Sequence, residues 1–104
     1  MKYRINENLI DGLWYNFDED LAFKIKPIRG IKVDYNKVFD IDYNIKTNIQ
    51  CIVDWRGVVD KDDNPLPFSA AFLGDLLLKV PDLQDWFYEK IAEVNNKFVE
   101  SLKN

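Results

Sequence analysis

The sequence predicts an α+β fold in a single domain over residues 1–104, with an N-terminal strand region (1–37) before a helical region (38–104). Three observations support this prediction: strand-like alternation in residues 21–27, a turn-rich connector over 54–69, and apolar residues at helical spacing after the connector. A chain of 104 residues with 47% hydrophobic side chains can bury one modest core but no large cavity.

The first expected element is a β-hairpin over about residues 9–27. Residues 21–27 alternate apolar with small or charged side chains, which is typical of a half-buried strand, and Pro27 ends that strand. Residues 9–17 supply the other strand, and the acidic residues 18–20 supply the turn. Because an isolated hairpin is marginal in water, we expect its apolar face to pack on the helices.

The middle of the chain allows two interpretations. Residues 28–37 fit either a third short strand or an ordered loop. Between residues 38 and 55, β-branched content and alternation favour a strand, whereas a second set of apolar residues has helical spacing. The alternating set is Phe39, Ile41, Tyr43 and Ile45, and the helical set is Ile41, Ile45, Ile49 and Ile52. The length of the run favours a helix over about residues 40–56, with the strand as the alternative.

The connector combines residues that turn the chain with residues that extend it. Gly57 can adopt a positive φ, and the polar cluster Asp60–Asn64 is typical of a turn. Pro65 and Pro67 fix φ and favour extended neighbours, so the chain should leave the turn straight. Ser69 is then placed to cap the helix that follows.

Two helices are expected after the connector, over about residues 69–80 and 82–102. Their apolar stripes contain Phe72, Leu73, Leu76, Leu77 and Val80 in the first, and Leu83, Phe87, Ile91, Val94, Phe98 and Leu102 in the second. Pro81 should end the first helix, and Asp82 should cap the second. The second stripe is the strongest periodic signal in the sequence, and a helix of about 20 residues spans about 30 Å.

The charge distribution argues against a nucleic-acid-binding protein. Lys and Arg number 14, Asp and Glu number 18, and the excess of acid lies entirely after residue 52. A helical nucleic-acid interface would need a basic surface in that region. A basic run does occur earlier in the chain, at Lys24, Lys26, Arg29 and Lys32. We interpret it as the solvated side of a strand, where lysines also deter strand-to-strand aggregation.

No catalytic, cofactor or metal site is expected. The sequence has no His, and its single Cys, Cys51, cannot build a zinc site. Residues 60–64 superficially resemble a calcium loop, but Pro65 stands at the glycine position and Ala71 at the position of the bidentate glutamate. The carboxylates fall on predicted turns and helix exteriors, so we expect the protein not to be an enzyme.

The sequence also predicts a cellular location. Cys51 has no partner for an intramolecular disulfide, which is typical of a reducing compartment. Residues 1–7 lack the apolar core of a signal peptide, and no apolar run is long enough to span a bilayer. We therefore expect a soluble, cytoplasmic protein with no membrane partner.

The last helix predicts a protein-binding surface. Trp86, Phe87 and Tyr88 are consecutive, and consecutive helical residues point about 100° apart, so their three rings cannot all face one core. Because aromatic residues are enriched in interface cores, this trio is the preferred partner-binding site. Leu66 and Phe68, which flank the second proline of the connector, are the second choice.

Several segments, in order, resemble the small tail assembly chaperones of long-tailed bacteriophages and prophages. They are the connector segments Asp54–Asp60 and Asp63–Ser69, a short leucine-rich helix that ends at Val80–Pro81, and a final helix that contains Phe98. Nearer the N-terminus, Gly12–Tyr15 and Phe23–Pro27 are similar to the region that opens many of these chaperones. The resemblance covers most of the chain, with Asn64 standing where such proteins often carry Gly.

The resemblance implies a non-enzymatic role in a bacterial host cell. The chain would bind the tape-measure protein during tail assembly, keep its long helices soluble and help to recruit tail-tube subunits. Such chaperones are often also made in a longer, frameshifted form. Two other classes stay open: a structural virion component, such as a minor tail or head–tail connector subunit, and a small acidic inhibitor of a host protein. A homo-oligomer is also compatible with the sequence.

Overall fold

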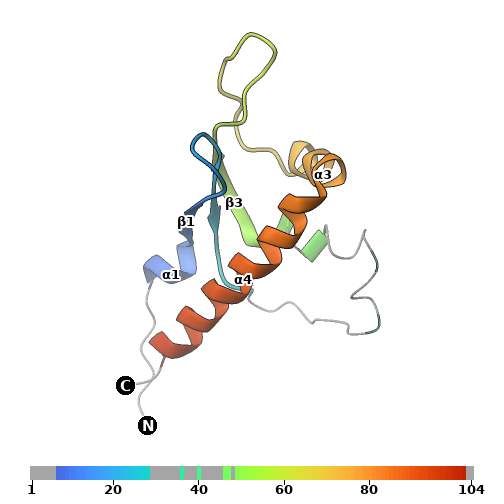
Figure 1. Cartoon of the computed structure of the whole chain (residues 1–104). Coiled ribbons are helices and arrows are strands. Elements are labelled where there is room, and N and C mark those ends of the chain that lie inside the picture. The colour runs from blue at the N-terminus through green and yellow to red at the C-terminus, as the bar shows by residue number, and fades with distance from the viewer. Residues whose placement is uncertain (1–6, 29–35, 37–39, 41–45, 48, 103–104) are drawn as a thin grey trace.

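A three-stranded antiparallel sheet and two C-terminal helices make up most of the fold (Figure 1). The structure is a computed structural model, and it describes residues 7–28, 36, 40, 46–47 and 49–102. In chain order the elements are α1 (Glu7–Asp11), β1 (Leu13–Asn16), β2 (Ala22–Ile25), β3 (Ile52–Arg56), α3 (Ala70–Lys79) and α4 (Pro81–Ser101). This arrangement confirms the predicted α+β class.

β1 and β2 form the predicted hairpin, with narrower bounds than the sequence suggests. The acidic turn between them is held by the Asp18 carboxylate, which accepts hydrogen bonds from the backbone N–H groups of Asp20 (2.8 Å) and Leu21 (2.7 Å). An aspartate that bonds the backbone two or three residues ahead is a common way to close a turn. Residues 9–11, expected in the first strand, belong instead to α1, and Gly12 turns the chain into β1 with φ of +112°.

The expected helix over residues 40–56 is wrong at its C-terminal end. Among the described residues of this range, 46–47 and 49–51 are helical, and 52–56 form β3. β3 pairs antiparallel with β2, with an irregularity in the register between Lys24 and Ile25. The physical reason is this pairing: a free edge of β2 supplies hydrogen bonds that the local sequence pattern does not reveal.

Part of the predicted middle region lies outside the described residues. Residues 41–45 carry no structural description, nor does most of the segment 28–37 that fits a strand or a loop. Of the basic run, Lys24 and Lys26 are half-buried at β2 and just after it, whereas Arg29 and Lys32 lie outside the described part.

The two C-terminal helices match their predicted positions closely. The Ser69 side chain caps α3, accepting a hydrogen bond from the Phe72 backbone N–H at 3.4 Å, as expected. α4 begins one residue earlier than predicted, with Val80 as its N-cap, so Asp82 lies in the first turn and is not the cap. Its carboxylate still lies at the positive end of the helix dipole.

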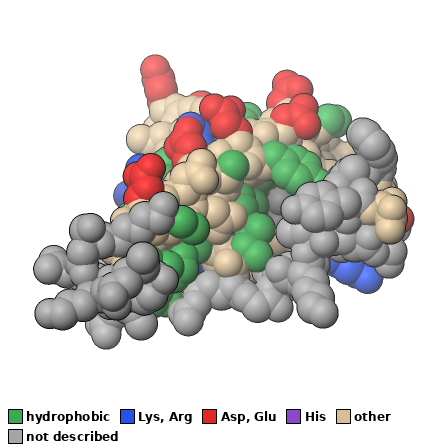
Figure 2. All heavy atoms as spheres, turned by 90° about the horizontal axis from the view of Figure 1, so that it is seen from below, with side chains coloured by type: hydrophobic (Ala, Val, Ile, Leu, Met, Phe, Trp, Pro, Cys, Tyr) green, Lys and Arg blue, Asp and Glu red, His purple; other side chains and the backbone are tan. Residues whose placement is uncertain are grey.

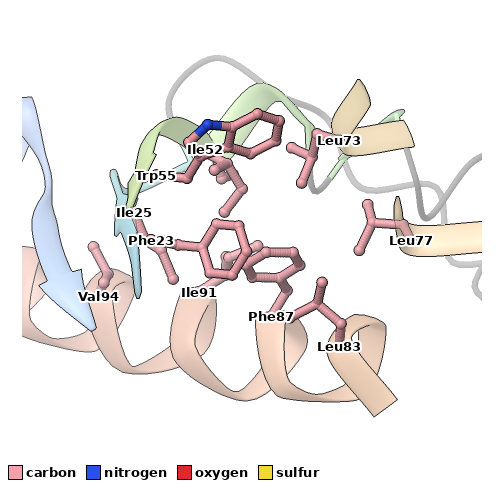
Figure 3. Packing of buried hydrophobic residues seen from close by; sticks show 11 residues of the cluster. Phe23, Ile25, Ile52, Trp55, Leu73, Leu77, Leu83, Phe87, Ile91 and Val94 are labelled. Carbon is pink, nitrogen blue, oxygen red and sulfur yellow. The ribbon is translucent and has the colours of Figure 1, made fainter. Parts of the chain in front are cut away.

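α4 crosses one face of the sheet, and α3 closes one end of the same core (Figure 1). Figure 3 shows side chains from the sheet and from both helices converging on a single cluster. The fully or almost fully buried members are Cys51 just before β3, Phe23, Ile25, Ile52 and Trp55 of the strands, Leu73 and Leu77 of α3, and Leu83, Phe87, Ile91 and Val94 of α4. Four positions of the predicted α4 stripe therefore face the core, whereas Phe98 and Leu102 are half-buried.

The connector forms a hairpin-like loop that projects beyond the sheet (Figure 1). Val59 and Pro65 bridge its two arms, and the Leu66 backbone N–H donates to the Val58 carbonyl at 2.9 Å. At the tip the Asp60 carboxylate accepts from the backbone N–H groups of Asp62 (2.8 Å) and Asn64 (3.0 Å). The predicted polar turn is thus confirmed.

Among the described residues, no helix combines the length and the apolar composition needed to cross a bilayer.

Candidate protein-binding surface

The three consecutive rings of α4 point in different directions, as the helical geometry requires. Phe87 is completely buried and stacks edge-on against Phe23, with ring centroids 4.7 Å apart. Trp86 is half-buried and lies against Phe17 (5.3 Å) and Phe23 (5.9 Å), where it closes the contact between α4 and the hairpin. Only Tyr88 is exposed, at 42%. Of the predicted trio, Phe87 cannot contact a partner without unfolding, and Tyr88 is the ring placed to do so.

The second-choice residues are tied to the core by Trp55. The Trp55 indole Nε1–H donates to the Leu66 carbonyl oxygen at 2.9 Å. The Phe68 ring packs edge-on against the Trp55 ring, with centroids 5.1 Å apart. Both Leu66 and Phe68 are half-buried. Their contacts with Trp55 fasten the base of the connector loop to β3.

The outer face of α4 carries a second apolar stripe, which the predicted core stripe of this helix does not include. Tyr88, Ala92 and Val99 are all exposed, Val99 at 50%. Their spacings of four and seven residues keep them within about 40° on the helix. On the helix this stripe is turned by about 60–140° from the core residues Phe87 and Ile91, so it borders the buried face. The signal in the sequence is a second, shorter apolar stripe with the same helical period, turned around the helix from the core stripe.

Acidic side chains run beside this stripe. α4 contains Asp82, Asp85, Glu89, Glu93 and Glu100, which fall in a band about 80° wide on the helix. All are exposed except Glu93, which is half-buried. Figure 2 shows Asp and Glu side chains gathered along one edge of that view, beside hydrophobic side chains. The outer face of α4 therefore combines apolar and negative character.

The two lysines of α4 lie beyond the acidic band, on the side away from the apolar stripe and close to β1. The ammonium groups of Lys90 and Lys97 stand 5.7 Å and 5.5 Å from the centroid of the Tyr15 ring, and Lys97 also contacts the Tyr15 hydroxyl at 3.3 Å. Lys90 donates to the Glu93 carboxylate at 3.1 Å, and this bond raises the pKa of Lys90 above its ordinary value. Glu89 is 4.0 Å from Lys90.

α3 is apolar around most of its circumference, yet it buries little of itself. Its ten residues include two charges, Asp75 and Lys79, and its two buried residues are Leu73 and Leu77. Phe72 is 52% exposed and Leu78 is 56% exposed. The predicted stripe placed Phe72 on the core face, and the structure corrects this. A helix that is apolar on several faces normally has neighbours on several faces.

Among the described residues, no group of three or more His, Cys, Asp or Glu side chains could hold a metal ion. Burial raises the pKa of the Cys51 thiol to about 11, although the Lys26 ammonium partly opposes the shift. A thiol with that pKa is protonated at neutral pH and is a poor nucleophile. Hydrogen bonds from the Asn64 and Asp62 backbone lower the pKa of Asp60, which fits its turn-closing role.

Comparison of the chain with protein-family models, curated proteins and solved structures found no match.

Proposed function

We propose that this protein is a non-enzymatic tail assembly chaperone of a phage or prophage, which binds the tape-measure protein in the host cytoplasm during tail assembly. The resemblance of the connector and the C-terminal helices supplies the family. The observation that carries the binding role is α3, whose Phe72 and Leu78 are more than half exposed on a helix with two charges in ten residues.

Exposed apolar side chains on a folded scaffold suit a chaperone of this kind. Fully burying a large apolar side chain stabilises a complex by about 1.5–3 kcal/mol, so a half-exposed one has about half of that left to contribute. Burial of Phe72, Leu78 and Tyr88 in a complex would therefore contribute about 2–4 kcal/mol in total, so other contacts with the client must add to them. A long helical client offers matching apolar faces at i, i+3 and i+4 spacing.

The acidic surface fits the same role. The chain has a net charge of −4, and the excess of acid lies in its second half. Like charges discourage two copies from meeting through their exposed apolar residues, and they attract a client with basic segments. A binding protein that must stay unoccupied until its client is made benefits from both effects.

Co-expression with a helical client tests this proposal. The client is the product of the long helical reading frame that should follow this gene, with a tail-tube gene before it. We expect the client to be insoluble alone, and to be recovered in solution and co-purified when this protein is present. The absence of any such reading frame nearby, or a client that gains no solubility, would contradict the chaperone role.

Purified tails distinguish the chaperone from a structural virion component. A chaperone leaves the particle after assembly, so mass spectrometry of purified tails should not detect the chain. Stoichiometric recovery of the chain in finished particles would favour a minor tail or connector subunit instead.

A further inference from the structure

We propose that the outer face of α4 binds an amphipathic helix that carries basic side chains along one flank. This face consists of the apolar residues Tyr88, Ala92 and Val99 together with the neighbouring band of carboxylates. The inference deepens the proposed function and rests on it for the biological setting, but its physical argument comes from α4 alone.

The shape of the face favours a helical occupant. α4 is a single helix of 21 residues, about 30 Å long, so a partner helix can lie along it for several turns. Tyr88 and Val99 are 11 residues apart, close to three full turns, and Ala92 between them is small enough for a second backbone to approach. Helices pack at interaxial distances of about 8–10 Å, the closer values requiring small side chains at the contact.

The charges of the face select a basic partner. Five carboxylates of α4 lie on its outer flank, whereas its two lysines are turned toward Tyr15 on β1. Lys90 nevertheless pairs with two members of the band, Glu93 at 3.1 Å and Glu89 at 4.0 Å. Asp82, Asp85 and Glu100 are exposed and form no ion pair within 4.0 Å with a described Lys or Arg. Lysine or arginine side chains of a partner helix would form ion pairs with these carboxylates.

The same charges disfavour a second copy of this chain as the occupant. In an antiparallel pair of α4 helices that met through Tyr88 and Val99, the two acidic bands would lie on the same side and repel each other. The occupant we infer is thus a different polypeptide, helical and basic on one flank.

Synthetic peptides provide the test, with the full chain as the binding partner. The probe is a 21-residue helical peptide with leucines along one face and lysines along one flank, and the matched peptide has glutamates in place of the lysines. Titration calorimetry at low salt should give a Kd at least about tenfold tighter for the lysine peptide. Raising the salt concentration should weaken the binding of the lysine peptide and bring the Kd values of the two peptides together.

Two substitutions on α4 and two matched controls locate the binding site. Val99→Asp and Glu89→Lys should each weaken the lysine peptide by about fivefold or more. The controls are Val59→Asp on the connector loop, where Val59 is 44% exposed, and Glu19→Lys on the exposed β1–β2 turn. With either control variant, the affinity for the lysine peptide should stay within about twofold of the parent value. All four variants should have melting temperatures near that of the parent chain.

The outcomes separate this inference from the proposed function. Equal binding of the two peptides, absence of binding, or equal effects of the α4 variants and the controls would overturn the inference. Sedimentation that shows a dimer of the chain, broken by Val99→Asp, would assign the face to a second copy and overturn it as well. None of these measurements uses the tape-measure protein, so the co-expression experiment tests the chaperone role independently.

Discussion

At the scale of single residues, Gly57 occupies the least replaceable position of the connector. It has φ of +91°, and a Cβ at this position would overlap the carbonyl oxygen of Asp20 in the β1–β2 turn. Both the backbone conformation and the close approach of the turn therefore require glycine. We expect Gly57→Ala to lower the free energy of unfolding by about 2 kcal/mol or more, measured by urea denaturation.

Gly74 of α3 is the matched control for this substitution. Its φ is not positive, and a Cβ there would stand 3.6 Å from the Ile49 side chain, an ordinary contact distance. Gly74→Ala should leave stability unchanged or raise it by up to about 1 kcal/mol, because alanine favours the helix. If both substitutions destabilise the chain equally, the account of Gly57 is wrong.

Cys51 predicts a loss of stability at high pH. Burial raises the pKa of its thiol from 9.0 to about 11 in the folded chain. Between these values the unfolded chain loses the proton first, so the thiol's contribution is intact below pH 9.0 and is lost as the pH rises toward 11. We expect an effect on the order of 1–2 kcal/mol by pH 11, measured by urea denaturation at a series of pH values.

Cys51→Ala isolates this effect from the titration of lysines and tyrosines. The variant should be less stable at neutral pH, because it leaves a cavity in the core, but it should lose less stability than the parent between pH 9 and 11. Parallel pH profiles for the two proteins would show that the buried thiol does not contribute.

The residue scale is where the sequence predicted most and where it also misled. The positive φ of Gly57 and the cap at Ser69 follow from residue type alone, and both are confirmed. The direction of a single ring does not follow from residue type. The sequence implied that at least one of three adjacent rings is exposed, and the packing of Phe17 and Phe23 on the helix decides that it is Tyr88.

At the scale of elements, α4 carries a buried ring and an exposed ring on adjacent residues. Phe87 is completely buried between α4 and the sheet, whereas Tyr88 is 42% exposed. We expect Phe87→Ala to cost about 3–5 kcal/mol, the usual penalty for removing a buried phenylalanine. Tyr88→Glu should change stability by no more than about 0.5–1 kcal/mol. Thermal melts followed by circular dichroism measure both.

We expect Tyr88→Glu to affect partner binding more strongly than it affects stability. Tyr88→Glu should weaken capture of a helical partner although the variant stays folded, because it places a charge in the apolar stripe of α4. A Tyr88→Glu protein that unfolds like Phe87→Ala would show that the tyrosine belongs to the core, and the proposed surface would then be wrong.

The elements that the sequence predicted well are those with local signals. α3 and α4 have helical periodicity, a capping serine and a proline between them, and their observed bounds differ little from the predicted ones. At β3 the sequence favoured a helix and kept a strand as the alternative, because the stability of β3 depends on pairing with β2, about 30 residues earlier in the chain. Its alternation is also short and follows helical residues directly, so a local pattern could not separate the two.

At the scale of the whole molecule, the sheet and the inner faces of α3 and α4 supply the core, and apolar side chains on the outer faces of both helices remain exposed. Composition and charge led us to expect an acidic protein whose helices do not bind nucleic acid. They could not show that α3 would lie at the end of the core with Phe72 and Leu78 exposed, because that placement depends on how the helices meet the sheet.

The affinity of the chain for a helical segment of the tape-measure protein tests the central claim most directly. Titration calorimetry should show binding by the parent chain, and a folded Phe72→Glu/Tyr88→Glu double variant should bind at least about tenfold more weakly. Equal affinity of the two proteins, or no binding by the folded parent, would contradict the claim that this molecule works by offering an exposed helical surface to another polypeptide.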